Sequence, residues 1–205
     1  MPDHPAKLSA KFLQHFIETA SAELGEKNLP VVLEKAGLPS EWAKSEIAAN
    51  LDEQAAAEAY AGIQQSLRTY YGRGARGILQ RIGSRLWEDL LENAPLKEKA
   101  QSKLMRRLPE TVRRKSALEM LSRLLGAKSS EITVHTLDMN LLLVDKISAA
   151  TFNQHATEPI CHVTHGLIRE AVYWATAHDP VIEETECKAN GGSACEFRIT
   201  FGDEE

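Results

Sequence analysis

The feature that most constrains the fold is the placement of the cysteines, since the chain has only three: Cys161, Cys187 and Cys195. Residues 181–201 contain two extended stretches joined by Asn190-Gly191-Gly192-Ser193, which is a strong β-hairpin signal. Such a hairpin brings Cys187 and Cys195 together. Cys161 follows Pro159, and proline favours the first turn of a helix. The pattern therefore predicts a hairpin and, next to Cys161, the start of a helix.

One chemistry that these thiols fit is metal binding. Three thiolates and one carboxylate suit tetrahedral Zn²⁺, and four protein ligands leave no open position for a catalytic water. Two other interpretations remain open from spacing alone, because free cysteines often pack as small apolar residues and short cysteine spacings also occur in redox sites. A disulfide is less favoured, since residues 1–7 lack the apolar run of a secretory signal.

The spacing leaves three candidates for the fourth ligand. Strict strand alternation places Glu183 on the same face as Cys187 and turns Glu184 away. A β-bulge would bring Glu184 back to that face. His165 lies four positions after Cys161, on the same face of the predicted helix, and is a third candidate.

Four short motifs resemble a known family. They are Pro159-Ile160-Cys161, Glu184-Thr185-Glu186-Cys187, Gly191-Gly192 and Cys195-Glu196-Phe197-Arg198-Ile199. Together, across residues 158–201, they resemble the 4-vinyl reductase domain, a small-molecule-binding domain that also serves as the sensory domain of phenol-responsive bacterial transcription activators. In those sensory members, zinc is held by three cysteines and a glutamate three positions before the second cysteine. The resemblance thus implies a structural Zn²⁺ site formed by Cys161, Glu184, Cys187 and Cys195.

The composition is that of a soluble globular protein, with 43% hydrophobic and 26% charged residues in a chain of 205. No apolar run is long enough to cross a membrane, so we expect a cytoplasmic protein. The net charge of −5 conceals a basic middle, because residues 64–128 carry 15 basic and 6 acidic side chains.

The basic residues of this middle segment are expected on solvated helix faces around Pro109. Neither aromatic interleaving nor a helix-turn-helix pattern accompanies them, so no nucleic-acid partner is predicted. The residues concerned are Lys97, Lys99, Lys103, Arg106, Arg107, Arg113, Arg114 and Lys115.

Helical periodicity marks the beginning of the chain, over residues 9–24, 30–36 and 52–71. We expect an N-terminal helical segment, residues 1–63, that serves in dimerisation or as a lid. Its alternative role is a helical cap with no further function. Residues 64–205 would then form the ligand-binding domain.

The stretch Gly72-Arg73-Gly74-Ala75-Arg76-Gly77 matches the G-x-G-x-x-G dinucleotide fingerprint letter for letter. That motif requires a buried strand before it, whereas an amphipathic helix precedes it here. We therefore interpret it as a loop between two helices, with Gly77 allowing close backbone packing.

Residues 132–144 predict a second hairpin, bent near Asp138-Met139. With the C-terminal pair this gives a four-stranded antiparallel sheet packed against helices, preceded by the N-terminal helical segment. The predicted class is α+β.

An apolar cavity between the sheet and the helices is the expected ligand site. Five side chains are candidates for lining this cavity. Because aromatic side chains at helical spacing are also common in an ordinary hydrophobic core, packing in the core is their alternative role. They are Trp87, His135, Phe152, Tyr173 and Trp174.

No nicotinamide or flavin motif and no nucleophile–base pair is recognisable, which favours binding over catalysis. The predicted function is a zinc-stabilised, homodimeric sensor or binding domain for a hydrophobic or aromatic small molecule. It has no ATPase or DNA-reading segment of its own, so a signal would pass to a protein partner. The alternative is an accessory enzyme or chaperone of tetrapyrrole metabolism, because the resembling family includes free-standing members of the bacteriochlorophyll pathway.

Overall fold

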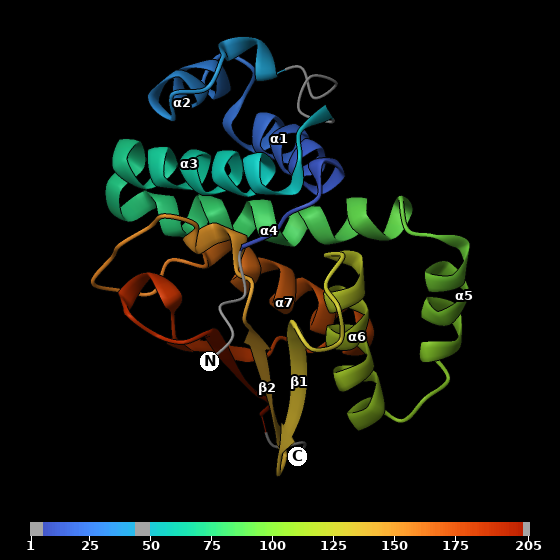
Figure 1. Ribbon diagram of the computed structural model, residues 1–205. Helices are drawn as coiled ribbons and strands as arrows, with labels where there is room; N and C mark the ends of the chain where they lie inside the picture. The colour runs from blue at the N-terminus through green and yellow to red at the C-terminus, as the bar shows by residue number, and fades with distance from the viewer. Residues whose placement is uncertain (1–5, 44–49, 203–205) are drawn as a thin grey trace.

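The computed structural model describes residues 6–43 and 50–202 of the protein. Its strands are β1 (Ile132–Leu137), β2 (Asn140–Asp145), β3 (Val181–Glu186) and β4 (Cys195–Thr200). Its α-helices are α1 (Ala10–Leu24), α2 (Leu29–Lys35), α3 (Glu53–Tyr71), α4 (Ala75–Glu92), α5 (Leu96–Met105), α6 (Glu110–Leu124) and α7 (His162–Thr176). The predicted α+β class is confirmed, and Figure 1 shows the helices gathered over one sheet.

The sheet consists of two antiparallel hairpins joined side by side. Its strand order is β1-β2-β4-β3, with every neighbouring pair antiparallel. The first hairpin turns at Asp138, whose φ of 53° is in the left-handed region, as the predicted bend near Asp138-Met139 requires. The central β2–β4 pairing places Leu143 opposite Phe197, both of them buried. This pairing holds the C-terminal hairpin in the sheet.

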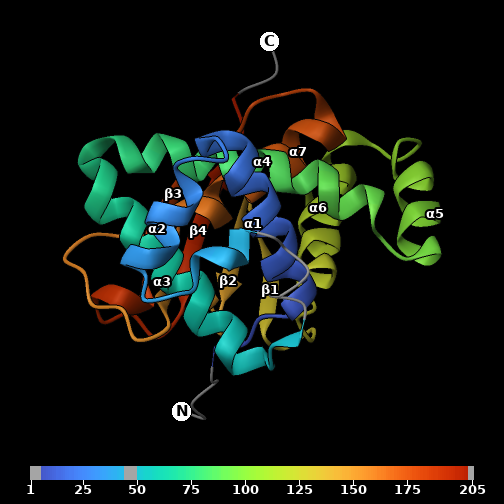
Figure 2. The same cartoon turned by 90° about the horizontal axis from the view of Figure 1, so that it is seen from above.

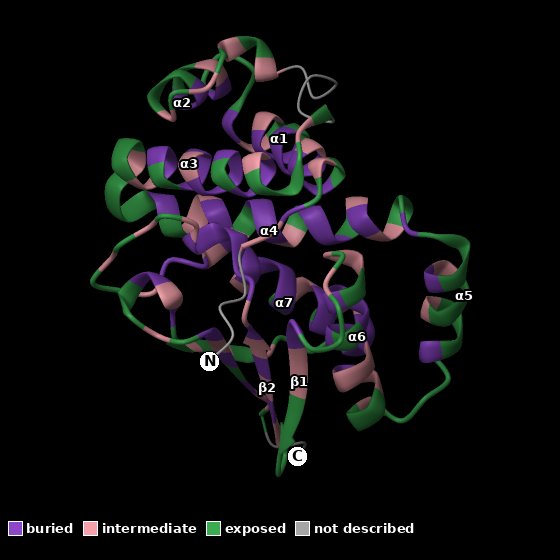
Figure 3. Ribbon diagram, viewed as in Figure 1, coloured by how far each residue is buried: buried purple, intermediate pink, exposed green. Residues whose placement is uncertain are grey.

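The helices form layers around α4. In Figure 1, α1 and α3 lie on one side of α4, while α7 and then the sheet lie on the other. Viewed from above in Figure 2, α5 projects at the edge of the molecule. Figure 3 shows buried residues concentrated along α4 and α7, and the completely buried Trp87 of α4 belongs to this core.

The N-terminal helices follow the predicted pattern. The hydroxyl of Ser9 accepts a hydrogen bond from the Phe12 amide and so caps α1. The rings of Phe12 and Phe16 pack edge-on against Tyr60 of α3, at centroid distances of 5.7 and 4.7 Å. The expected boundary between residues 63 and 64 falls inside the unbroken helix α3.

The glycine–arginine stretch joins two helices as predicted, but Gly77 does not have the role expected of it. A short 3₁₀ turn, Gly72–Gly74, joins α3 to α4, but Gly77 lies inside α4, where an added Cβ would meet nothing nearer than Arg81 Nη1 at 3.6 Å. The prediction of close packing at Gly77 is therefore wrong. Close packing occurs instead at Gly83 of α4 and Gly166 of α7, where an added methyl group would overlap the opposing backbone.

One member of the basic segment is also placed differently. Lys97, Lys103 and Arg107 are exposed, as predicted, but Arg114 is only 6% exposed. Its guanidinium bonds to Glu110 at 2.7 Å and lies over the Phe201 ring at 4.1 Å. A paired, stacked guanidinium tolerates burial where a free one would not.

Within residues 6–43 and 50–202, no helix combines the length and apolarity needed to cross a membrane. The expectation that a secretory signal is lacking depends on residues 1–7. Of these, residues 1–5 lie outside the described residues.

Candidate metal centre

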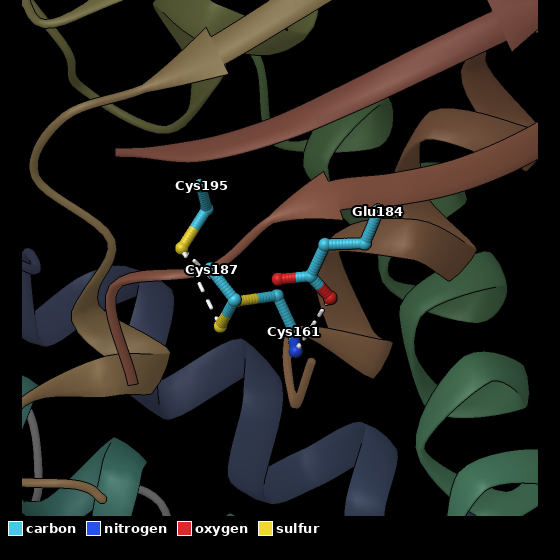
Figure 4. A group of neighbouring side chains, drawn as sticks. All are labelled: Cys161, Glu184, Cys187 and Cys195. Atoms are coloured by element: carbon cyan, nitrogen blue, oxygen red, sulfur yellow. Dashed lines mark hydrogen bonds between the residues drawn. The ribbon is translucent and has the colours of Figure 1, made fainter. Parts of the chain in front are cut away.

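The residue that precedes α7 and the C-terminal hairpin, which are distant along the chain, meet at the cysteines (Figure 4). Cys161 is the residue before α7, Glu184 lies within β3, Cys187 follows β3 directly, and Cys195 begins β4. Their ligand atoms, one from each residue, all lie within 4.8 Å of one another. The arrangement can therefore hold a metal ion.

The three sulfur atoms form a compact triangle. Cys161 Sγ lies 3.4 Å from Cys195 Sγ and 3.9 Å from Cys187 Sγ, and the third side is 3.9 Å. All three are free thiols and completely buried. Since a disulfide requires sulfurs about 2.05 Å apart, the geometry is that of separate ligands around a common point.

A β-bulge explains how Glu184 joins the cysteines. In the β3–β4 ladder, Glu184 pairs with Phe197 and Glu186 pairs with the next residue, Glu196, so Thr185 is the extra residue. The bulge shifts the alternation of side chains between Glu184 and Cys187. Glu183 remains exposed and faces Arg198 across the ladder. Of the two glutamates considered, the structure groups Glu184 with the thiols.

Backbone amides support the cluster. The Cys161 amide donates to Glu184 Oε2 at 3.1 Å, and the Lys188 amide donates to Cys195 Sγ at 3.4 Å. The Gly192 amide closes the turn by donating to the Cys187 carbonyl at 3.0 Å. Glu184 Oε1 is buried without a hydrogen-bond partner among the described residues. A buried carboxylate oxygen that is free to ligate, beside three thiols, fits the donor set of a cation site.

The electrostatics of the metal-free cluster favour partial protonation. Burial, with the nearby Cys187, raises the pKa of Glu184 to about 8. Hydrogen bonds from Cys161 and Cys195 lower the pKa of Cys187, while the same bond to Cys187 helps to raise the pKa of Cys161. A bound cation would reverse this balance, because metal ligands must lose their protons.

His165, the third candidate for a fourth ligand, lies outside this group. Its Nε2 is 3.3 Å from the Ile182 carbonyl oxygen. Its Nδ1 is buried without a hydrogen-bond partner among the described residues. The imidazole is thus oriented by β3 and not by the thiols.

The predicted pocket residues do not meet in one cavity. Trp87 and Trp174 pack edge-on with ring centroids 5.6 Å apart, as core residues do. Tyr173 is 45% exposed. His135 is exposed on β1 and is hydrogen-bonded to Thr133. Phe152 lines a separate hollow beside α2 and α3.

A hollow of about 430 Å³ does lie between a helix and the sheet, where α6 faces the β1–β2 turn. None of the five predicted pocket residues lines it. Its wall includes Thr111, Val112, Arg114, Lys115, Thr136, Met139, Asn140, Leu141 and Phe201. Sequence reasoning missed this set because its members come from three segments without a common motif.

A larger hollow of about 610 Å³ adjoins the metal centre. The α3–α4 junction supplies one wall and the start of α7 with β3 supplies the other. Its wall includes Arg68, Arg73, Arg76, Glu158, Pro159, His162, His165, Ile182, Glu183 and Glu184. The glycine–arginine stretch was its signal in the sequence, but we interpreted that stretch only as a loop.

The family comparison agrees with this geometry. Residues 144–201 match the 4-vinyl reductase domain. The matched segment contains all four residues of the metal cluster, and the match confirms the resemblance based on residues 158–201. No curated protein sequence matches the chain significantly.

Solved structures share the fold at low sequence identity. The phenol-responsive sensory domain of the transcription activator PoxR, solved with phenol, is 16% identical, and the alignment covers 69% of this chain and 72% of that domain with a TM-score of 0.51. An Fe(II) unliganded H-NOX protein from K. algicida is 10% identical over 96% of this chain and 98% of that one, with a TM-score of 0.61. A structure from work on heme distortion in the H-NOX family is 14% identical over 96% of each chain, with a TM-score of 0.52.

Proposed function

We propose that this protein is a small-molecule-binding sensor domain in which a structural zinc ion fastens the C-terminal hairpin to α7. The observation that carries the proposal is the cluster of Cys161, Glu184, Cys187 and Cys195, whose ligand atoms lie within 4.8 Å of one another. The match of residues 144–201 to the 4-vinyl reductase domain supports it.

Zinc is the metal that this donor set fits best. Soft thiolates select zinc over hard cations such as Mg²⁺ and Ca²⁺, and a fourth oxygen ligand completes a tetrahedron. With four protein ligands there is no vacant position for a substrate or water, so the role is structural. Because the site joins α7 to the hairpin, its binding free energy contributes to folding.

Metal analysis tests this directly. We expect about one zinc ion per chain in the purified protein, and a lower melting temperature after treatment with a strong chelator. Glu184→Gln should hold less zinc than the wild type. Glu183→Gln is the matched control for this variant, because Glu183 neighbours Glu184 but is exposed. A metal-free preparation whose melting temperature the chelator leaves unchanged would overturn the zinc proposal.

The ligand of this sensor would be a hydrophobic or aromatic small molecule. The hollow between α6 and the sheet has apolar wall residues, Val112, Leu141 and Phe201, with the hydroxyl groups of Thr111 and Thr136 nearby. Small-molecule sites combine such apolar surface with polar groups that orient the ligand, and this wall also carries the charged residues Arg114, Lys115, Glu119 and Asp138. PoxR, which shares the fold, was solved with phenol.

Phenol titration of the purified protein, followed calorimetrically, tests the site. Val112→Trp should fill the hollow and abolish binding. Val31→Trp on α2 is the control, because Val31 and Val112 are 41% and 45% exposed and Val31 lies outside this hollow. If Val112→Trp binds phenol as tightly as the wild type, this hollow is not the ligand site.

We propose that the domain passes its signal on through a homodimer or a separate protein partner. Exposed apolar side chains on α5 and in the turn after it support an interaction surface there: Leu96, Leu104 and Leu108. Light scattering of the purified protein with and without ligand tests the homodimer.

A second candidate function is a tetrapyrrole-binding role, as an accessory protein or chaperone. It is favoured by the similarity to H-NOX structures over 96% of this chain. In this role Arg106, Arg107 and Arg113 would meet propionate groups. Absorbance titration with a porphyrin distinguishes the two functions, since saturable binding that is lost when these arginines are replaced favours the second.

A further inference from the structure

Three arginines converge on the hollow of about 610 Å³ beside the metal centre. Arg68 lies in the last turn of α3, Arg73 in the 3₁₀ turn and Arg76 in the first turn of α4. Gly72 allows the chain to reverse here, because its φ of 54° is in the region that favours glycine. The three cationic side chains around this reversal of the chain therefore line one wall of the hollow.

The opposite wall comes from the segment that enters α7. Figures 1 and 2 show the α3–α4 junction on the same side of the molecule as the chain that leads into α7. Pro159, His162 and His165 line the hollow from this side. The hollow is therefore bounded by two parts of the chain that are distant in sequence.

Two polar atoms at this hollow lack partners among the described residues. Arg68 donates through Nη2 to Gln154 Oε1 at 3.1 Å, but its Nη1 is buried and unpartnered. His165 Nε2 faces the Ile182 carbonyl oxygen, so it must be the donor there, which leaves the buried Nδ1 as an unpartnered acceptor in the neutral ring. Burying a polar group without a hydrogen-bond partner costs free energy.

Arg73 and Arg76 have no salt bridge within residues 6–43 and 50–202. Glu158 and Glu183 line the hollow but are exposed. Glu184, the remaining acidic residue of the wall, is directed to the Cys161 amide and the thiols. The arginine wall thus retains unused donor capacity.

We propose that this hollow binds a small oxyanion that also carries a hydroxyl group or an acid proton, such as a hydroxy acid or a phosphate group. The guanidinium groups would hold the anionic oxygens, since arginine matches carboxylate and phosphate geometry. His165 lines the hollow, and a turn of its ring that exposes the buried Nδ1 would let this atom accept the hydroxyl or acid proton. This site is separate from the hollow between α6 and the sheet and does not depend on the function proposed for that hollow.

The experiment is calorimetric titration of the purified full chain with inorganic phosphate and with 4-hydroxybenzoate, at constant ionic strength set by sodium chloride. The variants are Arg76→Gln and, as the control, Lys27→Gln, which also removes one positive charge but from the exposed turn between α1 and α2. Saturable binding that weakens at least about tenfold in Arg76→Gln and is unchanged in Lys27→Gln is the expected result. Tighter binding of one probe identifies whether the ligand is a phosphate or a hydroxy acid.

Three outcomes would overturn the proposal. They are no saturable binding of either probe at millimolar concentration, equal weakening in both variants, and undiminished binding in Arg76→Gln. Metal content is measured alongside in Arg68→Gln. A loss of metal in this variant with no change in anion binding assigns Arg68 to charge balance at the thiolates and also counts against the proposal.

Discussion

Gly83 of α4 and Gly166 of α7 lie backbone to backbone, so that a Cβ added to Gly83 would be 3.0 Å from Gly166 Cα. It would also overlap the carbonyl oxygen of Val163. The absence of side chains at both positions lets the two helices approach this closely. The same contact sets the position of Cys161, which precedes α7, relative to the α3–α4 junction.

Replacing Gly83 by alanine should therefore separate the helices. We expect Gly83→Ala to lower the free energy of unfolding by at least about 2 kcal/mol, as overpacking of a close contact does. Gly77→Ala in the same helix has room for its methyl group and should raise stability by up to about 1 kcal/mol, because alanine favours helix. Urea denaturation measures both, and equal effects would contradict the close contact.

The metal-free protein should respond to Glu184→Gln in a pH-dependent way. The folded-state pKa of Glu184 is about 8, above the value of about 4.3 in an unfolded chain. Stability from the protonated form is fully present below about pH 4.3 and is lost as the pH rises through about 8. Glutamine has no proton to lose, so metal-free Glu184→Gln should gain stability relative to the wild type between about pH 5 and pH 8.

With zinc bound, the same substitution should have the opposite effect. A glutamine side chain at this position would lack the anionic oxygen, so we expect zinc affinity to fall at least about tenfold. Competition with a chromophoric chelator measures this. Glu183→Gln should change neither quantity, and a Glu183→Gln variant that behaves like Glu184→Gln would reassign the ligand.

His165 should be dispensable for the metal. Its Nε2 contacts the Ile182 carbonyl, so His165→Ala should retain the metal content of the wild type. Cys187→Ser should lose most of it, because a hydroxyl is a poor replacement for a thiolate in such a site. Elemental analysis of the two purified variants decides, and metal loss in His165→Ala would include the histidine among the ligands.

The buried position of Arg114 also has a measurable consequence. Arg114→Ala removes the ion pair with Glu110 and the contact with the Phe201 ring, and we expect a loss of about 1–3 kcal/mol in unfolding free energy. Arg107→Ala, in the exposed part of the same basic segment, should stay within about 0.5 kcal/mol of the wild type. Thermal unfolding separates the two.

The secondary structure was largely predictable because its signals are local. Hydrophobic periodicity located α1, α2 and α3 to within a few residues, and the Asn-Gly-Gly-Ser and Asp-Met turns located both hairpins. The conflict between Glu184 and strand alternation predicted the bulge that the β3–β4 ladder contains. Each of these depends on residues that are near one another in sequence.

What could not be predicted depends on contacts between distant segments. Nothing near Gly83 or Gly166 in the sequence shows that α4 and α7 cross there, so Gly77 was the glycine expected to pack closely. Arg114 appeared as one cation among several, because Phe201 is far away along the chain. The aromatic residues expected in one cavity are divided among the core, the surface and a hollow beside α2.

The extra residue at Thr185 lets Glu184 and Cys187 share one face of the strand although they are three positions apart. Deletion of Thr185 would leave Glu184 opposite Phe197 and Glu186 opposite Glu196 in a regular ladder, where residues two positions apart share a face. Natural or engineered variants of this fold should thus tolerate substitution or loss of residue 185, whereas a deletion elsewhere in β3 would turn side chains to the opposite face.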